Sequence, residues 1–317
     1  MIVTQRDVRK YLDKEKFFNN FKIIGIKSGL SNCNYIIETE KGKFIFRTNK
    51  LKPGKDVKYL IDEYNVLKFF KQHSLDYVPE TFFFDQEKNV HILSYIEGRK
   101  IRFRNISQRG MEEAVSKLYQ INSLAPEYLK YCQENKAYCK EPKSEVDRLR
   151  GRILKKLETI SAENLFSDVK DWVAIRLNED FNDLRIDKSK IYLNHGDPAD
   201  NLIITKGKIS IIDWEYVRLT HGPGLVHILA HGALSSERSE KILQHYAKIS
   251  GEPFLELKYN TLTEKNIHYL LKLAKICFAH ESDRVFSEME IEPVRKNIQR
   301  IMHNYKQIKK TLANLNN

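Results

Sequence analysis

The chain has 317 residues, of which 41% are hydrophobic and 30% are charged, and its formal net charge is +12 at pH 7. This composition is typical of a globular protein with one large core or two lobes, and no apolar run approaches the roughly 18 residues that indicate a membrane span. The N-terminus lacks a signal-peptide pattern, and four scattered cysteines without a CxxC pair predict reduced thiols, so we expect a cytoplasmic protein.

The first elements predict a hairpin that covers a nucleotide. A short charged helix is expected within residues 1–20, and three apolar segments predict strands: residues 21–27, 35–39 and 44–47. The polar loop between the first two strands contains Ser28 and Gly29, and backbone N–H groups beside a glycine can approach phosphates. A single glycine is also common in ordinary turns, so the loop is weak support by itself.

An ion pair is predicted behind this hairpin. Arg47 lies on the third predicted strand, on the face opposite Phe44 and Phe46. Residues 57–73 predict a helix, and Glu63 lies on or beside its apolar stripe. An unpaired buried charge is costly, so Glu63 needs a cationic partner, and Arg47 is the nearest candidate. The alternatives are an exposed Arg47 at a sheet edge and a solvated Glu63.

Two further strands complete a predicted five-stranded sheet with one helix: residues 78–84 and 90–96. A Glu-Gly-Arg breaker follows them. We place the boundary there between an N-terminal nucleotide-binding lobe, 1–96, and a C-terminal catalytic and acceptor-binding lobe, 97–317. A connector at this point would expose backbone groups to the edge of an adenine, which makes Ser94 and Ile96 candidate cofactor-binding residues.

From residue 107 onward apolar residues recur at helical spacing, which predicts a larger and mainly helical second part. Helices are expected at residues 111–123, 145–160, 168–178, 236–249 and 288–315, and from residue 225. Residues 124–145 are polar and tyrosine-rich, contain two prolines, and predict an irregular insertion. Thr261 and Glu264 have the spacing of a capping box, which predicts a helix start there.

The residues that carry chemistry lie between 191 and 215. Strands are predicted at residues 191–193, 202–205 and 208–212, and a Lys-Gly turn joins the last two into a hairpin. Asp197 and Asn201 precede the hairpin and Asp213 follows it, so we expect these three side chains to converge. One carboxylate can take a hydroxyl proton, while another carboxylate and an amide hold Mg²⁺ on ATP, which is the set of groups that a kinase needs.

These residues resemble the aminoglycoside phosphotransferase and choline/ethanolamine kinase superfamily. The motifs that carry the resemblance are His195-Gly196-Asp197 with Asn201, and Ile211-Ile212-Asp213-Trp214-Glu215-Tyr216. The resemblance covers most of residues 20–232. It implies an α+β, two-lobed, protein-kinase-like fold, in which a small N-terminal antiparallel sheet with one helix precedes a larger, mainly helical C-terminal lobe.

The resemblance also implies a role for each matched residue. Asp197 matches the catalytic base, and Asn201 and Asp213 match the two metal ligands. Arg47 matches the phosphate-binding position, and Glu63 matches its partner on the helix.

Three more residues of the catalytic segment are singled out by the resemblance. His195 matches a residue that braces the catalytic loop, whereas Glu215 could bind metal, brace the loop or face the acceptor. The family usually has four residues between its Asp and Asn, but only three separate Asp197 from Asn201 here. The shorter loop could bring Asp200 near the metal, and it makes the position of Asn201 the main structural question.

The resemblance therefore predicts an ATP- and Mg²⁺-dependent phosphotransferase that acts on a hydroxyl of a small molecule, with an amino alcohol such as choline or ethanolamine favoured by the Asp-Trp-Glu-Tyr sequence. Aminoglycosides, thiamine, sugars and nucleosides are the alternative acceptors. A catalytically impaired, nucleotide-binding pseudokinase is the second class, because of the shortened loop. Binding of nucleic acid or of a membrane surface through the basic helices is a weaker third, since the positive charge is spread evenly and predicts a solvated surface.

Overall fold

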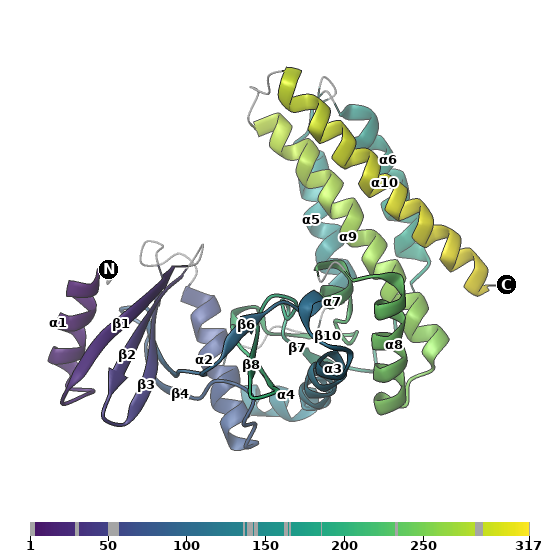
Figure 1. Ribbon diagram of the computed structural model, residues 1–317. Helices are drawn as coiled ribbons and strands as arrows, with labels where there is room; N and C mark the ends of the chain where they lie inside the picture. Colours follow the sequence, from purple (N-terminus) through teal and green to yellow (C-terminus); the bar gives the residue numbers. More distant parts are fainter. Residues whose placement is uncertain are drawn as a thin grey trace. The chain divides into compact units, whose positions relative to one another are not determined.

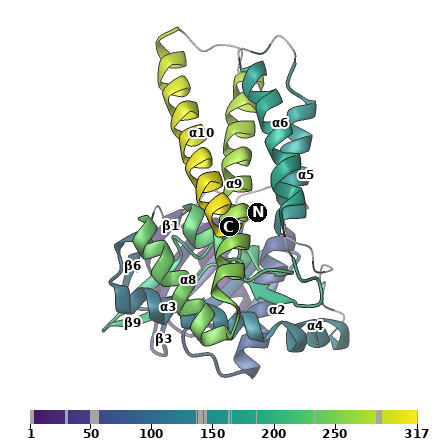
Figure 2. The same ribbon diagram turned by 90° about the vertical axis from the view of Figure 1, so that its right-hand side faces the viewer.

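The computed structural model describes residues 4–28, 32–49, 57–135, 137, 142, 145–161, 164, 166–184, 186–231, 234–282 and 288–316 (Figures 1 and 2). The chain forms two compact units. The first comprises Met1–Ala114, Leu124–Lys140 and His195–Arg218, and the second comprises Val115–Ser123, Glu141–Asn194 and Leu219–Asn317. The segment with the predicted catalytic residues thus belongs to the unit that contains the N-terminal sheet. The division into residues 1–96 and 97–317 stays a prediction, because compactness alone does not define which residues bind nucleotide.

The first unit begins with the predicted five-stranded antiparallel sheet (Figure 1). In spatial order its strands are β1 (Phe21–Ser28), β2 (Asn32–Thr39), β3 (Gly42–Asn49), β5 (Val90–Ser94) and β4 (Thr81–Asp85). Tyr35 and Phe46 are buried on one face of the sheet, together with Tyr11 and Leu12 of α1 (Gln5–Glu15). The first turn of α1 is fixed by a capping box between Thr4 and Asp7.

Helix α2 (Val57–Gln72) carries a fully buried stripe that includes one charged residue. Leu60, Glu63, Leu67 and Phe70 follow one another at intervals of three or four residues, and each is 0% exposed. The ring of Phe70 meets the indole of Trp214 edge to face, with ring centroids 4.8 Å apart. Glu63 therefore lies on the apolar stripe itself, and its carboxylate requires partners inside the unit.

A second sheet in the first unit contains the predicted hairpin. Strands β8 (Leu202–Thr205) and β9 (Lys208–Ile211) are joined through Lys206 and Gly207, whose φ angles of 50° and 83° are both positive, as a two-residue hairpin turn demands. β6 (Arg99–Ile101) pairs antiparallel with the other side of β8. A strand of three residues is too short to show a periodicity, and β6 was not predicted. The short helices η1 (Phe103–Asn105) and η2 (Trp214–Tyr216) flank this sheet in the sequence.

In the second unit, three long helices pack against α9 (Phe254–Ser282), as Figures 1 and 2 show. They are α5 (Glu145–Glu158), α6 (Ser167–Asn182) and α10 (Glu288–Asn316). The remaining elements are α3 (Gln108–Ser123), which is divided between the units, α7 (Val226–His231), α8 (Ser236–Ser250), and the paired short strands β7 (Tyr192–Asn194) and β10 (Arg218–Thr220). Among the described residues, no helix is both long and apolar enough to cross a membrane.

Two predictions for the helical part are wrong. The segment expected to be irregular contains α4 (Ala125–Glu134), because its proline lies in the first helical turn, where the missing N–H costs nothing, and Tyr128, Tyr131 and Cys132 form a buried stripe. The proposed capping box at Thr261 lies inside α9, which begins earlier, at Phe254, and buries Thr261 to 2% exposure. The α+β class and the order of the sheet and the helical part are as predicted.

Candidate active site

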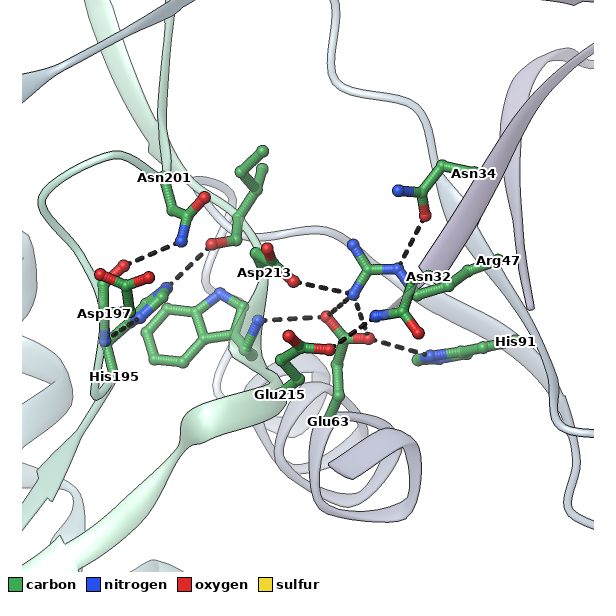
Figure 3. A network of polar contacts seen from close by, with 12 residues as sticks. Asn32, Asn34, Arg47, Glu63, His91, His195, Asp197, Asn201, Asp213 and Glu215 are labelled. Atoms are coloured by element: carbon green, nitrogen blue, oxygen red, sulfur yellow. Dashed lines mark hydrogen bonds and ion pairs between the residues drawn. The ribbon is translucent and has the colours of Figure 1, made fainter. Parts of the chain in front are cut away.

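The predicted ion pair between Arg47 and Glu63 is present and buried (Figure 3). Nη1 of Arg47 donates to both carboxylate oxygens of Glu63, at 2.7 and 2.6 Å, and Nε donates to Oδ1 of Asn34 at 2.9 Å. The two side chains are 8% and 1% exposed. Arg47 therefore faces α2 and is not a solvated cation. For Nη2 of Arg47, no hydrogen bond to the described residues is recorded.

Glu63 is the hub of this network. The backbone N–H of Trp214 donates to its Oε1 at 3.1 Å, and Nδ1 of His91 lies 3.4 Å from its Oε2. Burial by itself would raise the pKa of Glu63, but the Arg47 guanidinium, then His91 and the Trp214 N–H, outweigh burial and lower the pKa to about 2. Burial lowers the pKa of His91 more than the charge of Glu63 raises it, so the His91 imidazole is neutral. Glu63 thus ties β3, β5 and the segment after β9 to α2.

Asp213 lies at the end of this network in a strained backbone conformation. Its φ and ψ of 69° and 64° are left-handed, a region that Asp tolerates better than most residues do. Oδ1 of Asp213 accepts a hydrogen bond from Nη1 of Arg47 at 3.0 Å, and the side chain is 31% exposed. The carboxylate therefore reaches the solvent-accessible edge of an otherwise buried cluster.

Glu215 is tied to the strand that follows the predicted phosphate loop. It is 8% exposed, and its Oε2 accepts a hydrogen bond from Nδ2 of Asn32 at 2.6 Å. Burial and, after it, the charge of Asp213 raise the pKa of Glu215. Gly29 lies outside the described residues. Ser28 ends β1 and pairs with Cys33 in the ladder between β1 and β2.

His195 braces the loop that presents Asp197. Its Nδ1 accepts the backbone N–H of Asp197 at 3.2 Å, and its Nε2 lies 2.8 Å from the carbonyl oxygen of Ile212. These two partners fix the tautomer with the proton on Nε2. Burial lowers the pKa of His195 to about 4, so the ring is neutral at neutral pH. Asp197 itself is half-buried, and burial, followed by the charges of Asp213 and Asp200, raises its pKa.

The loop from Asp197 to Asn201 is one residue shorter than the family pattern, and it forms a tight turn. The backbone N–H of Asn201 donates to the carbonyl oxygen of Pro198 at 3.3 Å, and Nδ2 of Asn201 donates to the carbonyl oxygen of Asp197 at 2.9 Å. Oδ1 of Asn201 accepts from Nζ of Lys100 at 3.3 Å. Asp200 points away into an exposed ion pair, with its Oδ1 3.5 Å from Nε of Arg102. The short loop therefore keeps Asn201 beside Asp197 (Figure 3).

The predicted adenine-edge residues lie at the end of β5. Ser94 is the last residue of that strand, its Oγ accepts the backbone N–H of Glu80 at 2.8 Å, and its own backbone N–H donates to the carbonyl oxygen of Glu80 at 2.9 Å. Ile96 follows two residues later and is half-buried. The structure records no contact that assigns either residue to a ligand.

For several residues of the network, the sequence predicts no contact at the site. Asn32, Asn34, His91 and Lys100 reach the site only through strand pairing. Oδ1 of Asn32 is buried without a hydrogen-bond partner among the described residues, which marks an unfilled acceptor next to Glu215. An isolated Asn or Lys in a short strand is too common for its spacing to predict such a contact.

The side-chain oxygens of Asp213 and Asn201 are ligands of the kind that a magnesium ion prefers. Mg²⁺ is usually held by one or two carboxylates together with substrate phosphates and water, so a complete protein cage is not required. No group of three or more His, Cys, Asp or Glu side chains forms a metal cage within the described part of the chain. Oδ1 of Asp213 and Oδ1 of Asn201 both accept from cationic donors, Arg47 and Lys100, so both oxygens already face positive charge.

Comparison with known proteins places this site in context. The model of a family described as a phosphotransferase enzyme family matches residues 22–221. No curated protein matches the sequence. The structure resembles choline kinase LicA from Streptococcus pneumoniae, at 20% identity over 95% of this chain and 99% of that chain, with a TM-score of 0.57; LicA is also known in complex with AMP.

Two antibiotic phosphotransferases have similar folds. Macrolide 2′-phosphotransferase MphH from Brachybacterium faecium is 15% identical, over 89% of this chain and 100% of that chain, with a TM-score of 0.63. The protein of the streptomycin–ATP–APH(2″)-IIa ternary complex is 14% identical, over 86% and 91% of the two chains, with a TM-score of 0.55. At these identities the likeness establishes the kinase-like fold predicted from the sequence, but not the substrate.

Proposed function

The chain belongs to the phosphotransferase enzyme family, and from this premise we propose that it is an ATP- and Mg²⁺-dependent kinase of a small hydroxylated molecule. The observation that carries the proposal is the buried network of Arg47, Glu63 and Asp213, set in the same unit as the Asp197 loop. A buried cation held by two carboxylates, beside a half-buried carboxyl group, supports phosphoryl transfer, which depends on positioning and charge neutralisation.

In this proposal, Arg47 binds the phosphates of ATP that are not transferred. Glu63 holds one side of its guanidinium through Nη1, and Nη2 is the group that we propose donates to phosphate oxygens. A guanidinium that is already fixed loses little rotamer entropy on binding a ligand. The complexes with AMP and ATP among the structural relatives support this choice of nucleotide.

Asp197 is the proposed general base. Its carboxylate accepts the proton of the acceptor hydroxyl as the hydroxyl oxygen bonds to the terminal phosphorus and the bond from that phosphorus to the bridging oxygen breaks. Burial raises the pKa of Asp197, which makes its carboxylate a better proton acceptor. Gly196 allows the backbone conformation that precedes Asp197. Its φ is +86°, and a Cβ there would lie 2.4 Å from the carbonyl oxygen of Tyr216.

Asn201 and Asp213 are the residues that would hold Mg²⁺. The ion would neutralise negative charge on the phosphates. Glu215 is buried and bound to Asn32, so we assign it to bracing rather than to contact with the acceptor. Asp200 faces Arg102 and has no part in this arrangement.

An amino alcohol is the proposed acceptor class. The Asp213-Trp214-Glu215-Tyr216 sequence favours it, and a choline kinase is among the structural relatives. Antibiotic phosphotransferases are also among the structural relatives, so an aminoglycoside or another hydroxyl compound is the alternative acceptor. The four scattered cysteines, which include no CxxC pair, favour a reducing compartment, and the cytoplasm is part of the proposal.

The proposal is tested by measuring ATP consumption with a panel of amino alcohols, aminoglycosides, sugars and nucleosides, with and without Mg²⁺. Asp197→Asn is expected to lower turnover by at least about a hundredfold while ATP affinity stays within about twofold, because the base acts on the acceptor. Asp13→Asn, on the exposed face of α1, is the matched control and is expected to match the wild type. Near-normal turnover by Asp197→Asn would rule out the base. Mg²⁺-dependent ATP binding without turnover on any acceptor would instead identify a pseudokinase.

A further inference from the structure

A small pocket lies within the second unit, where the segment that leads into β7 meets the start of α9. Its lining includes Tyr192 of β7 and both Glu256 and Thr261 of α9. The cavity volume is about 60 Å³. Because one water needs roughly 10–15 Å³, a ligand of about four non-hydrogen atoms would fill the pocket. None of the residues that we assign to phosphoryl transfer lines it.

Three carboxylates of the pocket act on one hydroxyl group. Oε1 of Glu252 accepts the hydroxyl proton of Tyr192, with 2.9 Å between the two oxygens, and Asp187 and Glu256 also line the pocket. Burial and, after it, the charges of Glu252, Asp187 and Glu256 raise the pKa of Tyr192. The half-buried Tyr192 hydroxyl therefore lies in a negative potential, which attracts a cation.

Two cations also line the pocket, and both act on Asp187 at its exposed edge. Hydrogen bonds from Ser189, and then the charges of Lys190 and His221, lower the pKa of Asp187. For Glu252 and Glu256, in contrast, no ion pair is recorded within the described part of the chain. The two carboxylates at the start of α9 are thus the groups that a positively charged ligand would meet.

The position of Glu256 has one purely structural explanation. It lies in the first turn of α9, where a carboxylate stabilises the positive end of the helix dipole. This effect accounts for Glu256 alone. It does not explain why Asp187 and Tyr192, which come from the segment around β7, bring a further carboxylate and a hydroxyl to the same pocket.

A buried hydroxyl in the pocket provides an independent observation. Thr261 lines the pocket and is 2% exposed, yet no hydrogen bond of its Oγ1 to any described residue is recorded. Thr263, one turn position away on the same helix, donates to the carbonyl oxygen of Tyr259 at 3.0 Å. Buried polar groups are almost always hydrogen-bonded, so the Thr261 hydroxyl calls for a partner from outside the chain.

We propose that this pocket binds the primary ammonium group of a small molecule. Such a group has one positive charge and three N–H donors, which match the acceptor oxygens of Glu252, Glu256 and Thr261. A quaternary ammonium group has the charge but no N–H donor, so it satisfies none of these oxygens. The inference goes beyond the proposed function and does not depend on it. The amine belongs either to the phosphoryl acceptor or to a second ligand, and kinetics distinguish these sources.

The ligand class is tested by ligand-observed NMR titration of the full-length protein with propylamine. This amine has four non-hydrogen atoms, is protonated at neutral pH and has no hydroxyl group to be phosphorylated. We expect the wild type to bind it at least about tenfold more tightly than tetramethylammonium, which lacks N–H donors. Equal affinities for the two cations overturn the proposal, and so does displacement of propylamine by Mg²⁺ at a lower concentration than that of the amine.

The pocket is tested with variants in the same titration. Glu252→Gln/Glu256→Gln is expected to raise the Kd for propylamine by about tenfold or more, and Thr261→Val, which keeps the side-chain shape, by about threefold or more. The control Glu158→Gln/Asp171→Asn removes two exposed carboxylates of the same unit outside the pocket. It should leave the Kd within about twofold. Equal weakening in both double variants indicates only general attraction by charge and overturns the pocket, as does an unchanged Kd in all variants.

The source of the amine is distinguished by the kinetics of ethanolamine phosphorylation. A KM for ethanolamine that rises in Glu252→Gln/Glu256→Gln as much as the Kd for propylamine assigns the pocket to the amine of the acceptor. An unchanged KM assigns it to a second ligand. The NMR titration requires no turnover, so it still reports on the pocket if no acceptor is phosphorylated and the proposed function fails.

Discussion

Replacing Glu63 by glutamine tests whether the buried ion pair stabilises the first unit. Glutamine keeps the size of the side chain but removes the charge that faces Arg47, a residue only 7% exposed. Breaking a buried pair by removing one partner costs roughly 3–5 kcal/mol, because the other charge stays buried. The amide oxygen of glutamine can still accept the N–H of Trp214, so we expect the lower end, a loss of about 3 kcal/mol in the free energy of unfolding.

The assay is urea denaturation followed by tryptophan fluorescence. The chain has two tryptophans, and Trp172→Phe in the second unit leaves Trp214 as the reporter of the first unit. The matched control is Glu38→Gln, an exposed carboxylate on β2, which is expected to change the free energy of unfolding by less than about 0.5 kcal/mol. A loss for Glu63→Gln as small as that of the control would refute the reasoning.

The pH dependence gives an independent check. The pKa of Glu63 in the folded state lies below its ordinary value of 4.5, so the pair contributes its full stability above that pH and loses it as the pH falls towards about 2. The difference between the wild type and Glu63→Gln should therefore be constant from pH 7 to 5 and shrink below about pH 4.5. A difference that stays constant down to pH 2 would contradict an ionised Glu63.

Two further predictions concern the loop before Asp197. Gly196→Ala should destabilise the first unit by about 3 kcal/mol, since it combines a φ of +86° with a Cβ 2.4 Å from a backbone oxygen, whereas Gly207→Ala, with a φ of +83° and open space, should cost about 1 kcal/mol in the same urea assay. Burial holds the pKa of His195 near 4 in the folded state, below its ordinary value of 6.5. As the pH falls, the unfolded chain therefore binds a proton at this residue before the folded chain does, and the free energy of unfolding should fall by up to about 3 kcal/mol between pH 6.5 and 4. His195→Gln should flatten that slope; an unaltered slope would mean that His195 is not its source.

The pair formed by Arg47 and Glu63 could be predicted because both residues break a strong local pattern. Glu63 is the single charge on a stripe whose other members are fully buried, and Arg47 is the cation on the nearby strand. A charge at a core position needs a partner of opposite charge, and the sequence shows both the buried carboxylate of Glu63 and a cation that can pair with it, Arg47. The hairpin after Asn201 could be predicted equally well, because a Lys-Gly turn between two apolar segments is compatible with few other structures.

The contacts of Lys100, Asn32 and His91 could not be predicted for the opposite reason. Each lies on a strand whose neighbour is distant in the sequence, and only the pairing of β6 with β8, or of β3 with β2 and β5, brings it to the site. The capping box at Thr261 failed for a related reason. The local motif predicts a helix start at Thr261, although the apolar stripe of α9 begins one turn after Pro253.

Charge is what sets this site apart from ordinary packing. Glu63, Asp213 and Glu215 all act on the single guanidinium of Arg47, while His91 is neutral, so carboxylates exceed cations. Apolar side chains of similar volume often serve a core as well as a buried ion pair does, so stability alone does not account for the excess. A divalent cation at Asp213 and Asn201 would offset it, which is why Mg²⁺ belongs in the proposed function.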